Sequence, residues 1–263
     1  MIQLNKKNKI ILFFKNVLFN FLTILENILF LNKGNKLSTS NELITHGWKN
    51  LNTNFKDLLP IDVEKIQNHS PYSSLLIVNE ENIKVIINKI LNKSNIMQEI
   101  ENSTGMKYSI DFFLHWEIRN IPEDLSKKQY FANLWHRDTF FTRNVIKLFI
   151  LTHDTSADNG PITWINKVDT DNILKNNYNE FNEDLYESKK NIFTGNEGQA
   201  CLINPNVCLH KASNPKEGHH RRLIMLQLNP SRKISYKNDL YDRQFKLEPN
   251  IPFIRNLFRK SAK

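Results

Sequence analysis

The pattern of hydrophobic and polar positions divides the chain near residue 105. Between residues 36 and 105, polar loops surround a segment that predicts a helix, NEENIKVIINKILNKSNIMQEIEN at 79–102. From about residue 106 to residue 232, short apolar runs alternate with turns that are polar or rich in Gly, Pro and Asn. Several short strands at close spacing favour a barrel or a double-sheet jelly roll. We therefore expect an all-β core with flanking helices, folded as a double-stranded β-helix (a jelly roll or cupin-like barrel).

The second part of the chain contains seven segments with the pattern of strands. They are KYSIDFFLHWEIRN (107–120), QYFANLWHRD (129–138), RNVIKLFILTHD (143–154), GPITWI (160–165), GQACLINP (198–205), VCLHKAS (207–213) and RRLIMLQLN (221–229). The insertion at 167–195 is acidic and rich in Asn, and we expect it to be partly helical. A basic tail follows at 233–263. Residues 36–263 are thus expected to form a single domain, with a helical flank over 36–105 and a jelly-roll core over 106–232.

Residues 1–35 are expected to form an N-terminal amphipathic helix. Polar residues interrupt the apolar segment 10–31, whose longest unbroken apolar run is five residues, whereas a helix that spans a membrane needs about twenty mostly apolar residues. No small-residue cleavage site follows, which argues against a signal peptide. Two interpretations remain open: a helix packed on the domain, or a helix that makes peripheral membrane contact through residues 1–31 with help from its basic flank. Four polar residues recur at helical spacing and form one narrow stripe: Asn16, Asn20, Thr23 and Asn27.

Composition narrows the class of partner only slightly. The formal net charge is +9, and the basic residues are densest at the two ends of the chain. Since zinc-finger spacing and an aromatic RNA-binding signature are both absent, we expect no nucleic-acid partner. The two cysteines, Cys201 and Cys208, form no disulfide framework, so a reducing cytoplasm is the expected compartment, with contact at the inner face of a membrane left open.

The candidate chemistry begins with NLWHRDTFF at 133–141, where Trp135, Phe140 and Phe141 flank a His and an Asp. On a β-strand, residues two apart point to the same face, so His136 and Asp138 would project together. The best third ligand on a distant strand is His210. Two imidazoles and one carboxylate on one face of a metal suit non-haem Fe(II) and leave positions open for other ligands.

The spacing of that pair is weak evidence by itself, because His115 and Glu117 share it. The order of the surrounding elements is more specific. From about residue 131 to residue 229, the chain resembles the phytanoyl-CoA dioxygenase-like group of Fe(II)/2-oxoglutarate oxygenases. The likeness runs through Trp135 and the His136-Arg-Asp138 pair, the Asn159-Gly160-Pro161 turn, the segment GNEGQACLINPNVCLH leading to His210, and HHRRLIMLQL.

This resemblance implies that His136, Asp138 and His210 bind Fe(II), with 2-oxoglutarate and O₂ as co-substrates. Arg221 follows His210 by eleven residues, the interval at which the family places the arginine that binds 2-oxoglutarate; the adjacent Arg222 remains the alternative. The resemblance also places an aromatic residue, Phe149, in the co-substrate pocket. Because the carboxylate ligand is present, we expect hydroxylation of a small molecule, with release of succinate and CO₂.

Lys147 is open to two interpretations. It interrupts an apolar strand segment, on the same face as Phe149 and Leu151. Either its stem snorkels at a strand edge, or its charge reaches the carboxylate of the co-substrate or of the substrate.

The chain also departs from the family. Gln199 replaces the usual Asp before the distal His, and Ala212 stands where a small hydroxyl residue is common. Two other functions therefore stay open: a cupin-type metalloenzyme that does not use 2-oxoglutarate, such as an isomerase, and a non-catalytic membrane-associated binding protein. The substrate and the oligomeric state are not predicted.

Overall fold

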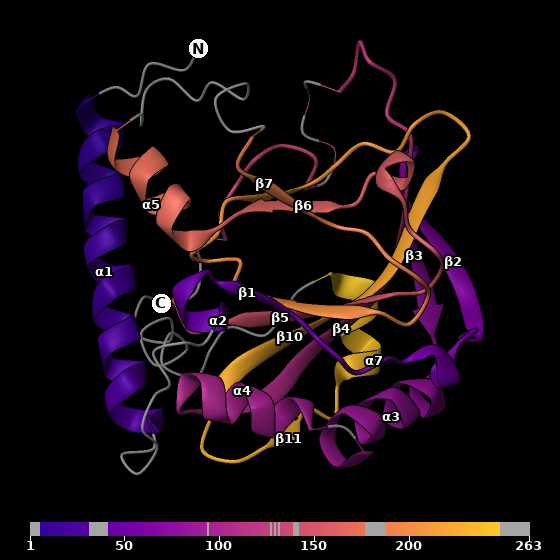
Figure 1. Ribbon diagram of the computed structural model, residues 1–263, viewed down its shortest axis with the longest axis horizontal. Helices are drawn as coiled ribbons and strands as arrows, with labels where there is room; N and C mark the ends of the chain where they lie inside the picture. Colours follow the sequence, from indigo (N-terminus) through magenta and orange to yellow (C-terminus); the bar gives the residue numbers. More distant parts are fainter. Residues whose placement is uncertain are drawn as a thin grey trace.

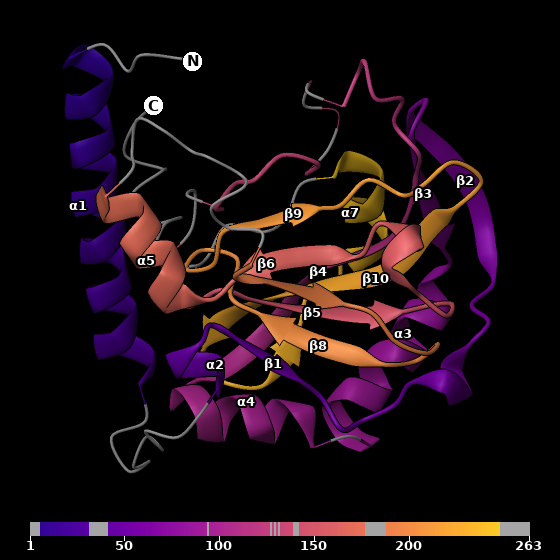
Figure 2. The same ribbon diagram turned by 45° about the horizontal axis from the view of Figure 1, so that its top comes forward.

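The computed structural model describes residues 6–31, 42–93, 95–126, 128, 130, 132–138, 142–176 and 188–247. Its centre consists of a large and a small β-sheet that pack on each other, with helices on the outside (Figures 1 and 2). Side chains from both sheets form one shared cluster, which includes Phe149, Trp164 and Leu223. The expected all-β core with flanking helices, in the form of a jelly roll, is confirmed.

The strands of both sheets pair antiparallel, with one short exception. The large sheet has the order β1 (Trp48–Asn50), β8 (Ala200–Ile203), β5 (Ile146–Leu151), β10 (His220–Ser231), β4 (Lys107–Arg119), β3 (Ser73–Val78) and β2 (Val63–Ser70). The exception, β11 (Ser235–Tyr236), pairs parallel with β4. The small sheet has the order β7 (Lys190–Phe193), β6 (Ile162–Ile165) and β9 (His210–Ala212).

Six of the seven predicted strand segments contain a strand, and the segment at 129–138 does not. Its described residues form turns and a single β-bridge at His136. The Asn133 side chain explains the difference, because it accepts a hydrogen bond from the Tyr130 N–H and donates to the carbonyls of Ser126 and Lys128. A side chain that satisfies backbone groups in this way favours a loop over a sheet ladder.

The expectation of a helical flank over residues 36–105 requires correction, because this region also supplies β1, β2 and β3 to the large sheet. β1 pairs with β8 and β3 with β4, both outside this region. Among the described strands, β2 pairs only with β3 and is mostly exposed, so it lacks the apolar alternation that marks a strand. The insertion is partly helical as expected, with α5 (Lys167–Asn176), and it ends in β7. The remaining short helices are α2 (Glu42–Thr45), η1 (Lys56–Leu58), η3 (Ala157–Asn159) and, in the expected basic tail, α7 (Leu240–Lys246).

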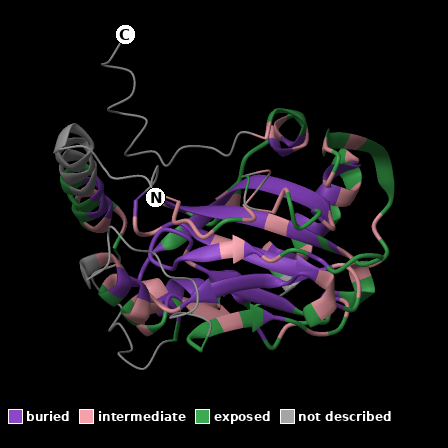
Figure 3. Cartoon of the chain, turned by 90° about the horizontal axis from the view of Figure 1, so that it is seen from above, coloured by how far each residue is buried: buried purple, intermediate pink, exposed green. Residues whose placement is uncertain are grey.

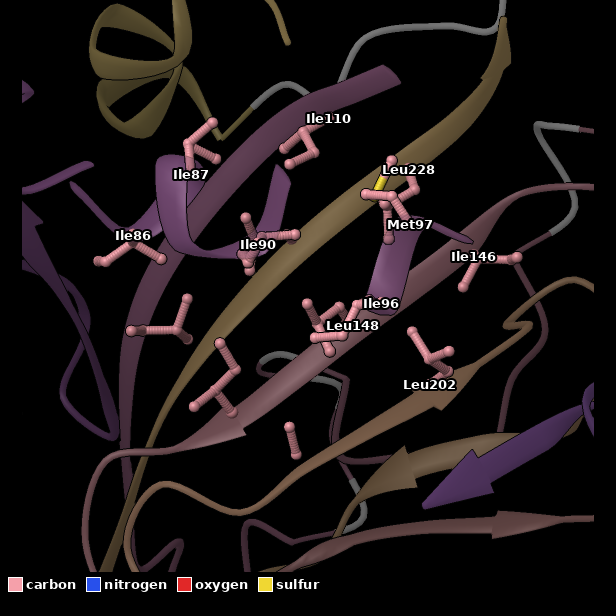
Figure 4. Close-up of a cluster of buried hydrophobic side chains, with 14 of the residues drawn as sticks. Ile86, Ile87, Ile90, Ile96, Met97, Ile110, Ile146, Leu148, Leu202 and Leu228 are labelled. Carbon is pink, nitrogen blue, oxygen red and sulfur yellow. The ribbon is translucent and has the colours of Figure 1, made fainter. Parts of the chain in front are cut away.

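The helix predicted over 79–102 is present as α3 (Glu80–Asn88), a π-helical turn η2 (Lys89–Lys93) and α4 (Ile96–Thr104). The Asn79 side chain caps α3 by accepting from the Asn82 N–H, and Gly105, with φ at 73°, ends α4. These helices cover one face of the large sheet (Figure 4). The buried cluster there joins helical and strand side chains, among them Ile86, Ile87, Ile90, Ile96, Met97, Ile110, Ile146, Leu148, Leu202 and Leu228.

Alternation along β5 divides its side chains between this outer core and the space between the sheets. Ile146, Leu148 and Ile150 join the cluster under the helices, whereas Phe149 and Leu151 join the cluster shared by both sheets. This two-residue period is the normal consequence of strand geometry. It carries Lys147, between Ile146 and Leu148, onto the inner face.

The N-terminal helix α1 (Lys6–Phe30) packs on the domain through the second half of its length, on the left in Figure 1. Glu26 accepts hydrogen bonds from Thr142 and from Asn144 Nδ2, and Thr23 Oγ1 accepts from the Arg143 N–H at 3.0 Å. Residues 1–5 and 32–35 of the expected helix, and residues 248–263 of the tail, lie outside the described residues. No helix in the described ranges is both long enough and apolar enough to cross a membrane.

Replacing Glu26 with Gln is expected to leave stability unchanged below pH 4.5 and to stabilise the protein increasingly as pH rises from 4.5 to 7, with the full effect above pH 7. Burial raises the pKa of Glu26 from 4.5 to about 7, against the hydrogen bonds from Thr142 and Asn144. A carboxyl whose pKa is higher in the folded state destabilises the fold as pH rises through this window, here by about 3 kcal/mol. In thermal unfolding, the variant should melt several degrees higher than the unmodified protein above pH 7. Below pH 4.5 the two should melt at the same temperature. If the difference in melting temperature were the same at both pH values, ionisation of the buried Glu26 would not be its cause.

Candidate metal centre

The three predicted metal ligands lie together at the edge strand of the small sheet. His136 Nε2 is 3.7 Å and His210 Nε2 is 3.9 Å from Asp138 Oδ1, and the candidate donor atoms of all three lie within 4.8 Å of one another. Two donors that each bind one ion at about 2.1 Å can be at most about 4.2 Å apart. Donors on one face of an ion lie closer, about 3 Å apart, so the three side chains can share one ion once they move together by about one to two ångströms.

Backbone hydrogen bonds hold the two parts of this cluster against each other. The His136 N–H donates to the His210 carbonyl at 3.0 Å, and the His210 N–H donates to the His136 carbonyl at 2.9 Å. The Asp138 N–H donates to the Pro205 carbonyl at 3.1 Å. On its other side, His210 pairs with Trp164 in β6, so the cluster is tied to the small sheet.

Each imidazole is oriented by a backbone carbonyl. His136 Nδ1 lies 2.8 Å from the Leu134 carbonyl, and His210 Nδ1 lies 3.1 Å from the Cys208 carbonyl. A carbonyl only accepts, so both Nδ1 atoms carry the proton and both Nε2 atoms keep a lone pair directed at Asp138. This is the arrangement that fixes the tautomer of a metal-binding histidine.

Neighbouring charges keep Asp138 ionised, and burial keeps His210 neutral. Burial opposes ionisation of Asp138, but Lys147 and the two imidazoles lower the pKa of the carboxyl from 3.8 to about 2. Burial lowers the pKa of His210 from 6.5 to about 4, although Asp138 raises it. A neutral imidazole and an ionised carboxylate are the forms that bind metals, and both are present at neutral pH.

The rival pair of the same spacing has other partners. His115 and Glu117 lie on β4, on the face opposite the cluster between the sheets. Glu117 pairs with Arg119 at 2.7 Å and with Arg222 at 2.5 Å, and His115 lies 3.3 Å from Thr152 Oγ1. Within the described ranges, the group of His136, Asp138 and His210 is the one set of three such side chains with the geometry for a metal ion.

A cavity of about 90 Å³ adjoins the two histidines. Its wall combines apolar side chains with three cations, Lys147, Lys211 and Arg221, and its members come from β4, β5, β6, β9, β10 and the segment 132–136. They include Leu114, Trp116, His136, Lys147, Phe149, Ile162, His210, Arg221, Leu223 and Met225. Leu114, Trp116, Leu223 and Met225 were not singled out in the sequence, although each stands on the inner face that strand alternation predicts.

Arg221 is 3% exposed and lines this cavity. One of its terminal nitrogens donates to the Gly160 carbonyl, while Nε is buried with no hydrogen-bond partner in the described part of the chain. Burial lowers the pKa of Arg221 to about 9, so it is still charged at neutral pH. The adjacent Arg222 is exposed and bonds Glu117. Of the two arginines, the structure turns Arg221 inward and Arg222 outward.

Phe149 and Lys147 also line the cavity. The Lys147 ammonium lies 2.6 Å from Asp138 Oδ2, and the two side chains are 16% and 19% exposed. Lys147 thus does not snorkel to a strand edge. Its partner is the candidate metal ligand itself, a contact that the sequence pattern had not suggested. Phe140 and Phe141 lie outside the described residues.

Neither a family model nor a curated protein matches the chain, so the resemblance to the phytanoyl-CoA dioxygenase-like group stays a prediction. Among solved structures, the chain is similar to EctD from S. alaskensis with 2-oxoglutarate and 5-hydroxyectoine (12% identity, 75% of this chain and 80% of that chain, TM-score 0.49). It is similar to HygX from Streptomyces hygroscopicus with nickel, 2-oxoglutarate and hygromycin B (12%, 74% and 88%, 0.48). A further similar structure is the epimerase SnoN with Fe3+, alpha ketoglutarate and nogalamycin RO (11%, 71% and 80%, 0.48).

Proposed function

We propose that the protein is an Fe(II)- and 2-oxoglutarate-dependent dioxygenase that hydroxylates a C–H bond of a small molecule. One observation carries the proposal: two histidine Nε2 lone pairs and one carboxylate oxygen lie together beside a cavity with a buried guanidinium. Backbone carbonyls orient the two imidazoles. Two histidines and one carboxylate on one face are the ligand set of non-haem Fe(II) oxygenases.

The protein residues would hold the ion and exclude water from it. His136, Asp138 and His210 would hold the ion, and the apolar cavity wall, with Phe149 and Leu223, would limit access of solvent. When bound, Fe(II) supplies the activation of O₂ that no amino-acid side chain provides. With the carboxylate present as the third ligand, hydroxylation accompanied by release of succinate and CO₂ is the reaction we propose.

Arg221 is the proposed anchor for the distal carboxylate of 2-oxoglutarate. A buried charge without an anion is costly, and the unsatisfied Nε leaves a donor available at the cavity. A planar guanidinium can hold a carboxylate with two parallel hydrogen bonds. Phe149 would pack against the chain of methylene groups between the two ends of the co-substrate.

We propose that Lys147 positions the carboxylate ligand, Asp138. Its ammonium holds Asp138 Oδ2 at 2.6 Å, while Oδ1 is the oxygen nearest to both Nε2 atoms. Lys147 would therefore orient the carboxylate so that Oδ1 is the oxygen available to the ion. Before the ion binds, it also balances a negative charge that is largely buried.

Replacing His210 with Ala is expected to abolish tight binding of Fe(II) and release of succinate. The matched control is His219→Ala, because His219 is an exposed histidine in the turn before β10. An anaerobic Fe(II) titration followed by a succinate assay in air, with 2-oxoglutarate present, measures both properties. Full iron occupancy and turnover in the His210→Ala protein would show that the ligand assignment is wrong.

Replacing Arg221 with Met is expected to weaken 2-oxoglutarate binding by at least tenfold and to leave Fe(II) binding unchanged. Loss of a charged hydrogen bond of about 1.5–3 kcal/mol gives a factor of this size. Arg222→Met removes the neighbouring, outward guanidinium and is the control. Calorimetric titration with 2-oxoglutarate, using the iron-loaded protein without O₂, compares the two. If Arg222→Met shows the larger loss, the anchor is Arg222. If neither variant loses affinity, the chain does not use 2-oxoglutarate in this way.

Replacing Lys147 with Met is expected to destabilise the metal-free protein and to increase the stabilisation gained from a divalent metal. Removing one partner of a largely buried pair leaves Asp138 without its cation, at a cost of about 1–3 kcal/mol after allowance for partial exposure. A bound ion restores the missing positive charge. Thermal unfolding with and without excess Co(II) tests this, and Asp138→Asn is the control that removes the response. If Co(II) raises the melting temperature of the variant by no more than it raises that of the unmodified protein, the assignment is wrong.

A further inference from the structure

Over residues 17–30 the helix α1 has a buried and an exposed face, and the buried face contacts the domain. Phe19, Leu22, Thr23 and Glu26 are buried against it. Because successive helical residues are about 100° apart, Val17, Ile24 and Ile28 cluster on the side opposite this buried face.

These three residues form the centre of a stripe, the outer stripe of α1, that is open to solvent. Val17 is 49%, Ile24 56% and Ile28 68% exposed. Three further apolar residues of the same helix are more than one-third exposed, namely Leu18, Phe21 and Leu29. Figure 3 shows the helix standing at the side of the molecule, with exposed residues along it. A contiguous apolar patch on a surface is a mark of an interaction site.

The charges of the N-terminal segment indicate the partner. Residues 1–41 contain six lysines and one acidic residue. That acidic residue is Glu26, which is buried between α1 and the domain, so the segment carries a formal excess of positive charge. An apolar stripe in a lysine-rich helix fits an anionic bilayer, which attracts the lysines and receives the apolar side chains. A second copy of the chain would bring the same lysines together and is disfavoured.

We propose that α1 docks the protein on the surface of an anionic lipid bilayer, with Val17, Ile24 and Ile28 entering the interface and the helix lying parallel to it. The opposite face remains attached to the domain through residues 142–144. This inference does not depend on the metal centre or on the proposed reaction.

The test is flotation of the full-length protein with vesicles of phosphatidylcholine alone and with vesicles that also contain phosphatidylglycerol. The protein should float with the anionic vesicles and much less with the neutral ones, and added salt should reduce the bound fraction. The triple variant Val17→Ser, Ile24→Ser, Ile28→Ser should bind the anionic vesicles at least tenfold more weakly. Because these side chains are exposed, the variant should keep the melting temperature of the unmodified protein.

The matched control removes three equally exposed apolar side chains elsewhere: Ile66→Ser, Val85→Ser and Val168→Ser. It should float like the unmodified protein. The proposal fails if the unmodified protein does not float with anionic vesicles, or if both triple variants lose binding alike. It also fails if sedimentation shows a dimer that the α1 substitutions dissociate, since the outer stripe would then bind a second copy.

Discussion

The metal centre depends on one antiparallel bridge between two segments that are 74 positions apart in the chain, at His136 and His210. Its two hydrogen bonds, at 3.0 and 2.9 Å, bring the imidazoles to a ring separation of 4.3 Å. Because the segment around His136 is not a strand, no longer ladder holds it there. Its position therefore relies on this bridge, on the hydrogen bonds from Asp138 N–H to Pro205 and from Ala212 N–H to the Ala132 carbonyl, and on the pairing of β9 with β6.

Along β5 and β10, alternate side chains point to opposite faces of the sheet. Those on one face pack under the helices, and those on the other face line the cavity. On β5, Leu148 packs under the helices while Lys147 and Phe149 face the cavity. On β10, Ile224 joins the helix-covered core while Arg221 and Leu223 face inward. Close packing of the helices on the outer face thus holds the strands rigid, and their inner face can carry the buried cations that binding would use.

The N-terminal helix combines a polar anchor with an apolar outer surface. Its buried face includes a carboxyl whose pKa is raised to about 7 by burial, which makes the attachment less favourable as pH rises. The anchor at Thr142, Arg143 and Asn144 lies in the chain between Asp138 and Lys147. The proposed membrane contact and the proposed iron site are therefore joined by a short stretch of backbone.

The sequence by itself determined the jelly-roll class, six of the strands and the helical segment at 79–102, because each depends on a local period of apolar residues. It also singled out His136, Asp138, His210 and Arg221 through the order of motifs, although the segment that carries His136 and Asp138 is not the strand that was expected. Tertiary structure decided the rest. How β1 and β3 are completed and which arginine turns inward depend on groups distant in the sequence. The anion that Lys147 meets, Asp138, is nearby in the chain but lies on a segment placed by its contact with β9. Such contacts form only when the sheets close, so no local pattern encodes them.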